Sequence, residues 1–78
     1  MAAPTFEETL EALLSLAKSD TPLTPAPVDD LVDPYLVGFG TETHTRRQEL
    51  AEAFSEKAEP THRSELIHKR IMHAGIIP

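Results

Sequence analysis

The apolar residues of this chain recur at helical spacing, most clearly near the N-terminus. There they lie at i, i+4, i+7, i+8 and i+11, which is the spacing of one face of an α-helix. These positions are Phe6, Leu10, Leu13, Leu14 and Ala17. Thr5 and Glu8 form a Thr-x-x-Glu capping box just ahead of them. The pattern predicts an amphipathic helix over residues 5–19.

Two further helices are predicted in the C-terminal half. Leu50, Phe54 and Ala58 form a stripe over residues 43–58, and the opposite side of that helix carries three glutamates, Glu49, Glu52 and Glu56. Ile67, Ile71 and Ala74 form a second stripe over residues 61–74. Gly75 is expected to end this last helix, because glycine commonly follows a helix C-terminus.

The intervening residues 20–40 are less regular. "DTPLTPAP" holds three prolines in six residues, which disfavours a helix and predicts a semi-rigid linker. "VDDLVDPYLVGFG" returns to helical spacing but is interrupted by Pro34. With Asp33 as N-cap and Pro34 at the first helical position, we expect a short helical turn near residues 29–37 that ends at Gly38.

The elements together predict a small all-α domain of three main helices. Its organisation is expected to be an N-terminal amphipathic helix over 1–19, a proline-rich linker and apolar turn segment over 20–40, and a C-terminal helical pair over 41–78. A chain of 78 residues buries a small core, and with no cysteine it has neither disulfides nor thiolate metal ligands.

The charge is distributed unevenly along the chain. The net charge is −6, all of it in residues 1–40, whereas residues 41–78 are balanced and hold all four histidines. An acidic chain is poorly steered toward nucleic acid. No apolar run reaches the roughly 20 residues of a membrane span. The acidic start disfavours a signal peptide. We therefore expect a cytoplasmic protein without a membrane partner.

The helix predicted over 61–74 keeps a nucleic-acid alternative open. It follows another helix after a short break, as in a helix-turn-helix, and one side is rich in basic and histidine residues. These residues are His62, Arg63, Lys69, Arg70 and His73. Against this alternative, the break "SEKAEP" is long and lacks glycine, and the preceding helix exposes glutamates.

No constellation of catalytic or metal-binding residues is evident. Glu65 and His68 have the Glu-x-x-His spacing of di-iron bundles, but no set of inward-facing carboxylates accompanies them. His62 and His73 share a face yet lie about 16 Å apart along a helix. The serines lack a glycine-elbow context, and "GFG" is too short for a phosphate loop. We expect no enzymatic activity, cofactor, metal or small-molecule substrate.

In length, acidity and a long loop after the first helix, the chain resembles acyl and peptidyl carrier proteins. That family carries Asp-Ser-Leu at the start of its second helix, and the serine bears the prosthetic group. The corresponding stretch here, "GTETHT", offers Glu42, Thr43 and His44 but no serine. The resemblance therefore covers size and helix layout, and the carrier function does not follow from it.

The function most consistent with these patterns is that of a small non-enzymatic protein acting by protein–protein contact, as a regulatory, accessory or phage-type modulator subunit. The apolar face of the first helix and the apolar turn segment must be covered, either by the chain's own core or by another chain, because leaving such side chains in water forfeits about 1.5–3 kcal/mol each. Self-association or a protein partner is therefore expected. The predicted partner-binding residues are Phe6, Leu10, Leu13, Leu14, Leu31, Tyr35, Leu36 and Phe39.

Overall fold

The computed structural model describes residues 3–73, which fold into four α-helices and one turn of 3-10 helix. In chain order these are α1 (Phe6–Lys18), α2 (Pro25–Leu36), η1 (Gly40–Glu42), α3 (Thr43–Lys57) and α4 (His62–His73). The described residues contain no strand, so the predicted all-α class is confirmed. The predicted count of three helices is wrong by one. Ala74 and the predicted helix end at Gly75 lie outside the described residues.

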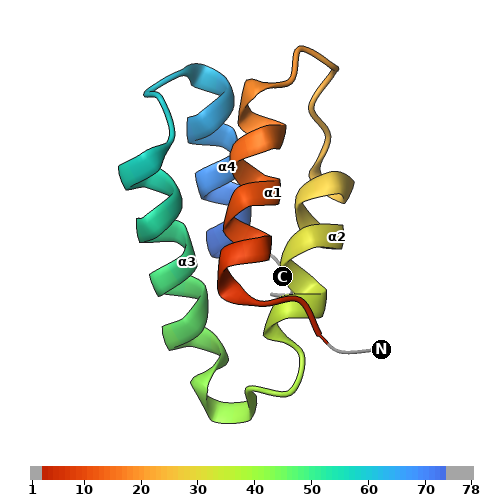
Figure 1. The fold of residues 1–78 in the computed structure, drawn as a ribbon, viewed down its shortest axis with the longest axis vertical. Coiled ribbons are helices and arrows are strands. Elements are labelled where there is room, and N and C mark those ends of the chain that lie inside the picture. Colours follow the sequence, from red (N-terminus) through yellow and green to blue (C-terminus); the bar gives the residue numbers. More distant parts are fainter. Residues whose placement is uncertain (1–2, 74–78) are drawn as a thin grey trace.

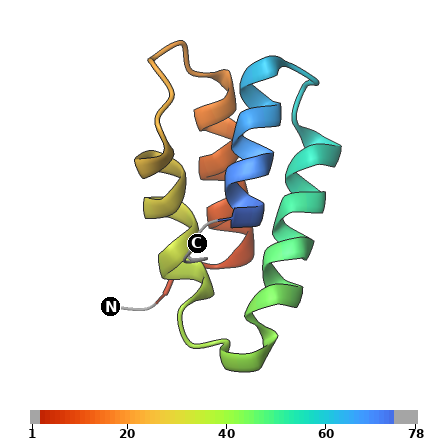
Figure 2. The same ribbon diagram turned by 180° about the vertical axis from the view of Figure 1, so that it is seen from behind.

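The four helices form a bundle of two antiparallel hairpins, α1–α2 and α3–α4. Figures 1 and 2 show α1 and α3 running in one direction and α2 and α4 in the other. Helix α1 lies beside α2 and α3, and α4 lies beside the same two helices. The connection through η1 crosses the end of the bundle, because α2 and α3 are diagonal to each other. Consequently α1 and α3 are parallel neighbours, separated in sequence by a whole helix.

Helix α2 covers most of the predicted short turn near residues 29–37 and extends it back into the predicted linker. Pro25 and Pro27 lie in its first turn, where backbone N–H groups have no helical partner to lose. Pro34 lies inside the helix but is exposed, so its missing N–H falls on the solvent side. The opposite side is buried through Val28, Val32, Tyr35 and Leu36. This burial outweighs the proline penalty of about 3 kcal/mol, since each such side chain contributes about 1.5–3 kcal/mol.

The ends of the helices largely follow local sequence signals. The capping box at Thr5 is present: the Glu8 backbone N–H donates to Thr5 Oγ1 at 3.1 Å, and the Thr5 N–H donates to the Glu8 carboxylate at 2.9 Å. Gly38 adopts a φ of 91° just after α2, as its predicted role as a stop requires. Helix α3 begins at Thr43 directly after η1, without a side-chain cap. None of the helices in residues 3–73 combines the length and apolar character that crossing a bilayer requires.

A single apolar core lies between the four helices. Its fully buried side chains include Leu13 of α1, Val32 of α2, Phe54 of α3 and Ile67 of α4. Residues from all three predicted chain segments therefore meet in one cluster. The apolar face of α1 is covered in cis, because the short connection over residues 19–24 folds α2 back along it.

Two arginines secure helix C-termini from a distance. Arg63 of α4 donates from Nε to the Leu16 carbonyl of α1 at 2.8 Å, and it also donates to the Thr21 carbonyl in the following connection. Arg47 of α3 is only 5% exposed and donates to the Ile71 carbonyl in the last turn of α4 at 3.0 Å. Burial lowers the pKa of the Arg47 guanidinium. Both contacts are made to carbonyls in the last turn of a helix, where backbone acceptors are commonly left without a helical donor.

A bidentate ion pair joins α2 to α4. The Asp29 carboxylate accepts hydrogen bonds from Nε of Arg70 at 2.6 Å and from the neighbouring guanidinium nitrogen. The hydrogen bond from Arg70 lowers the pKa of Asp29. Because the folded-state pKa lies below the unfolded value of about 3.9, the pair stabilises the fold above that value.

Truncating the central aromatic residue should test the shared core. Phe54→Ala is expected to reduce the free energy of unfolding by about 3–5 kcal/mol, since it leaves a cavity where all four helices meet. Urea denaturation followed by circular dichroism measures this loss. Ser55→Ala, at the exposed neighbouring position, is the matched control and should change stability little. A loss below about 1 kcal/mol for Phe54→Ala would contradict a single close-packed core.

Acid titration should isolate the contribution of the α2–α4 ion pair. Asp29→Asn is expected to lower the melting temperature at pH 7. The difference in melting temperature from the unmodified chain should shrink as the pH falls below about 4. It should disappear once the pH has passed below the lowered pKa of Asp29, where the carboxylate is protonated. Asp30→Asn makes the same charge change at an exposed position of α2 that has no ion pair among the described residues. Equal pH profiles for the two variants would mean that Arg70 contributes nothing through Asp29.

Candidate functional site

The structure uses two of the predicted nucleic-acid-binding residues for internal contacts. Arg63 is held at the end of α1, and Arg70 is paired with Asp29. His62, Lys69 and His73 are exposed on α4. The basic side of α4 therefore lacks the row of free arginines that phosphate and base contacts require.

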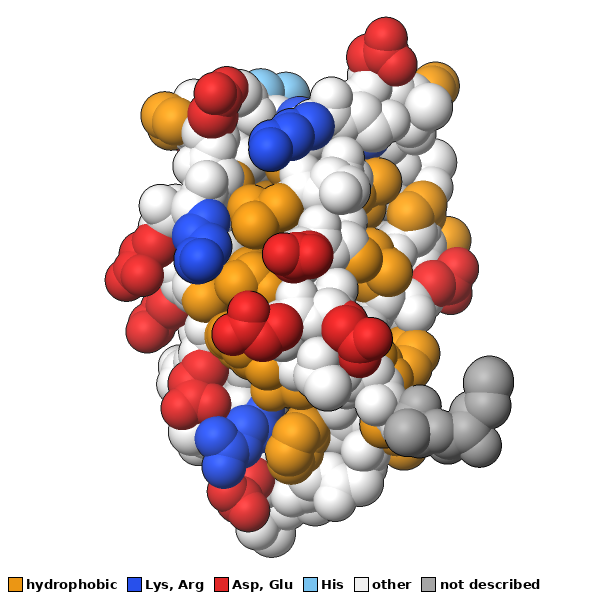
Figure 3. Space-filling model, in the orientation of Figure 1, with side chains coloured by type: hydrophobic (Ala, Val, Ile, Leu, Met, Phe, Trp, Pro, Cys, Tyr) orange, Lys and Arg blue, Asp and Glu red, His pale blue; other side chains and the backbone are white. Residues whose placement is uncertain are grey.

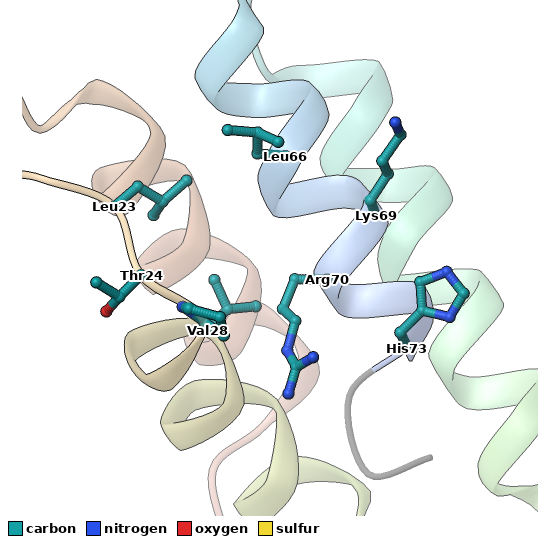
Figure 4. Close-up of a pocket in the computed structure, with 8 residues that line it drawn as sticks. Leu23, Thr24, Val28, Leu66, Lys69, Arg70 and His73 are labelled. Carbon is teal, nitrogen blue, oxygen red and sulfur yellow. The ribbon is translucent and has the colours of Figure 1, made fainter. Parts of the chain in front are cut away.

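A cavity of about 320 Å³ lies between α4 and the start of α2. Figure 4 shows Leu23 and Val28 on one side, Leu66 opposite them, and Arg70 reaching toward α2. Leu66 is 41% exposed, so the cavity is open and largely apolar. The first turn of α2 offers few backbone donors here, because Pro25 and Pro27 have no N–H. Arg70 is neutralised by Asp29, and the other ionisable side chains that line the cavity, Lys69 and His73, are exposed to solvent.

The more distinctive surface is a groove between the parallel helices α1 and α3. We call it the α1–α3 groove and define its apolar wall by Phe6, Leu14 and Ala17 of α1 and Ala53 of α3, all half-buried. Figure 3 shows this apolar strip running between acidic side chains on either side. The groove widens into two hollows, one of about 460 Å³ at the Phe6 end and one of about 400 Å³ at the Ala17 end.

Aromatic side chains form the base of the hollow at the Phe6 end. The rings of Phe6 and Tyr35 meet edge to face with centroids 6.0 Å apart, and Tyr35 meets Phe39 at 5.4 Å. The Arg46 guanidinium lies 5.6 Å from the centre of the Phe39 ring. This end of the groove therefore presents aromatic surface beneath charged side chains.

The side chain of Tyr35 is mostly buried, but its hydroxyl is open to the hollow and makes no hydrogen bond with residues 3–73. Its side chain is only 8% exposed and lines the hollow. Burial raises the pKa of its phenol, and the charges that act on it are those of Arg46 and Glu49 at the same hollow. The Tyr35 hydroxyl can hydrogen-bond to a group that enters the groove.

Carboxylates line both sides of the groove. Glu49, Glu52 and Glu56 of α3 border the hollow, and Glu7 and Glu11 lie on the same flank of α1 as Leu14 by helical spacing. Within the described range, Glu7, Glu11, Glu52 and Glu56 form no ion pair.

One guanidinium is placed among these carboxylates. Arg46 is paired with Glu49 at 2.9 Å and with Glu42 at 3.0 Å, and the hydrogen bond to Glu49 raises its pKa. Lys18 and Lys57 lie only at the far hollow. The Phe6 end of the groove is therefore strongly anionic.

This arrangement of glutamates is unfavourable for the isolated fold. Glu52 and Glu56 are four residues apart on α3, as are Glu7 and Glu11 on α1, and like charges at this spacing repel. Glu56 also lies near the negative end of the α3 dipole. Local rules of this kind are most often broken at functional sites. The groove is therefore the strongest candidate site on the described surface.

The predicted partner-binding residues divide between core and groove. Leu10, Leu13, Tyr35 and Leu36 are buried in the chain's own core, so the chain itself covers the apolar surface that the sequence showed must be covered. The reason is that α1 and α2 pack on each other and on the other helices in cis. Phe6 and Leu14 remain on the groove, while Tyr35 forms part of its floor.

The remaining two predicted partner-binding residues lie outside the groove wall. Leu31 is half-buried beside α1, and Phe39 is half-buried under Arg46. Sequence reasoning missed the part played by the glutamates of α3, which it assigned only to the solvent side. Their signal was the i, i+3, i+7 spacing of like charges along one side of the helix. That signal does not reveal which helix they would face.

Neutralising the glutamates should make the fold more stable. The double substitution Glu52→Gln with Glu56→Gln removes two like-charge pairs on α3, so we expect the free energy of unfolding to rise by about 0.5–1 kcal/mol at low salt. Thermal melts at low and high sodium chloride measure this gain, which should shrink as salt screens the repulsion. Glu65→Gln, at an exposed position of α4, is the control and should not raise the free energy of unfolding. A destabilised double variant would show that these carboxylates support the fold instead.

Comparison of the chain with protein-family models, with curated proteins and with solved structures finds no match.

Proposed function

We propose that this chain is a small non-enzymatic protein that acts by protein–protein contact, as a regulatory or accessory subunit, and that the α1–α3 groove is its contact surface. The observation that carries the proposal is the half-buried apolar wall of Phe6, Leu14, Ala17 and Ala53 beside unpaired carboxylates. Apolar surface framed by polar side chains is typical of protein interfaces.

The shape of the groove suits a helical segment of a partner. Two parallel helices leave a channel between them, and an amphipathic helix can lay its apolar side into such a channel. Helices α1 and α3 have 13 and 15 residues, so the channel is about 20 Å long at 1.5 Å per residue. A partner helix of about 14 residues would span it. The described residues contain no strand edge that could pair with an extended peptide.

Because the chain buries its own core, its partner is more readily a different protein than a second copy of this chain. Leu10 and Leu13 are already covered by the chain's own helices, which removes the need for self-association that an open α1 face would create. The groove that remains is partly covered, and its apolar wall is narrow. Binding there would add a further helix to a bundle that is already complete.

Site-specific crosslinking in the cells that produce the protein should test this function. A photoactivatable amino acid at Ala53 lies in the groove, whereas the same group at Gln48 lies on an exposed side of α3 that borders none of the hollows described above. We expect a defined protein adduct from position 53 and none from position 48. An adduct with a second copy would also support the groove as an interface, and sedimentation of the purified chain over a concentration series would confirm it.

Two results would overturn the proposal. One is the absence of any adduct at position 53 when the chain is folded and expressed, and the other is the same set of adducts from both positions. Co-sedimentation of the purified chain with a short DNA duplex at low salt would instead favour the exposed residues of α4, since such binding weakens steeply as salt rises.

A further inference from the structure

We infer that the occupant of the α1–α3 groove is a basic amphipathic helix, and that one of its lysine or arginine side chains enters the hollow above Tyr35. This inference rests on the proposed function and names the chemistry of the partner. It follows from three features that meet at one end of the groove: unpaired carboxylates, aromatic surface and the Tyr35 hydroxyl, which is open to the hollow.

The hollow at the Phe6 end has the features of a cation site. Glu52 and Glu56 supply negative charge without an ion-pair partner among residues 3–73. Phe6 and Tyr35 supply aromatic rings, and the face of an aromatic ring attracts a lysine or arginine side chain. The free Tyr35 hydroxyl can accept a hydrogen bond from an ammonium or guanidinium N–H. An anionic or purely apolar guest would leave all three features unsatisfied.

The structure already contains one example of this chemistry. Arg46 lies over the Phe39 ring at 5.6 Å while it is paired with Glu42 and Glu49. A guest cation over Phe6 and Tyr35 would repeat that arrangement one step along the same aromatic row, with Glu52 and Glu56 as its carboxylates. The internal arginine thus shows that the row of aromatic and acidic side chains can hold a cation.

The rest of the groove requires more than a simple cation. Leu14 and Ala17 continue the apolar wall away from the hollow, and Lys18 and Lys57 border its far end. A bound helix would therefore place apolar residues along the wall, basic residues toward Phe6, and no basic residue beside the two lysines. A polyamine has the charge but no apolar face, whereas DNA and anionic membranes would be repelled by the carboxylates.

A second copy of this chain does not present such a helix. Its most basic helix is α4, but Arg63 and Arg70 of α4 are engaged with α1 and α2, and Ile67 and Ile71 are in the core. Releasing α4 would dismantle the bundle. The complementary helix therefore belongs to a different protein.

Binding can be measured through Tyr35 itself. The chain has one tyrosine and no tryptophan, so its tyrosine emission reports on the hollow. The probe is a synthetic amphipathic helix of about 16 residues without aromatic side chains, with leucine on one face and lysine and arginine elsewhere. Its matched controls are the same peptide with every basic residue replaced by glutamate, and spermine.

We expect the basic peptide to change Tyr35 emission saturably with an affinity in the micromolar range. The acidic peptide should not bind, and spermine should bind at least 10-fold more weakly than the basic peptide. Equal binding of spermine would overturn the inference, since the apolar wall would then have no part in recognition. No saturable change with the basic peptide at low salt would also overturn it.

Charge-neutral variants then locate the site. Glu52→Gln with Glu56→Gln should weaken binding of the basic peptide by at least 10-fold, whereas Glu65→Gln, which makes the same kind of charge change on α4, should weaken it by less than 2-fold. Circular dichroism confirms that each variant is folded. Equal losses for both variants would attribute the binding to overall charge and overturn the inference.

The crosslinking experiment separates this inference from the proposed function. An adduct at Ala53 that persists unchanged in the Glu52→Gln, Glu56→Gln chain would keep the groove as a contact surface and overturn the basic partner. An adduct that is lost in that chain would support both. Absence of the adduct in the unmodified chain would overturn the contact surface itself, whatever the synthetic peptide does.

Discussion

The fold depends on one apolar cluster to which every helix contributes. A chain of this size buries only about 60–65% of its unfolded surface, so none of its helices can be withheld from the core. Leu13, Val32, Phe54 and Ile67 come from four different helices and are fully buried together. Because every helix must contribute to the core, the proline-rich segment folds into α2. Helix α2 then packs on α1 and covers its apolar face.

The same requirement decides which charged residues remain free. Bringing the helices together leaves carbonyls at their C-terminal ends, and the arginines at positions 47 and 63 reach across to satisfy two of them. Arg70 is held by Asp29. Both arginines of α4 are therefore engaged in holding the bundle together, whereas Glu7, Glu11, Glu52 and Glu56 have no ion-pair partner among residues 3–73.

Those glutamates make the groove acidic, and the repulsion between them lowers the stability of the fold. Packing α1 beside α3 gathers like charges around a narrow apolar wall and leaves Tyr35 with an unused hydroxyl. A cationic helix would relieve the repulsion and occupy the hydroxyl in one step. The arrangement can thus be understood as a bundle that is complete in its core but electrostatically unbalanced on one face.

The sequence by itself determined the helices whose signals are local. The capping box at Thr5 and the apolar stripes of α1, α3 and α4 act within a few residues, so periodicity revealed them. It predicted only a short turn near residues 29–37 in place of the full α2, because the penalties of the prolines are local whereas the compensating burial comes from other helices. Periodicity also shows which side of a helix is apolar but not what covers it, so it left open whether Leu10 and Leu13 are covered in cis or by another chain. Only the tertiary structure decided that α1 lies beside α3, since the diagonal crossing through η1 is set by packing of the whole core. That choice puts acidic side chains on either side of the apolar wall and creates the groove.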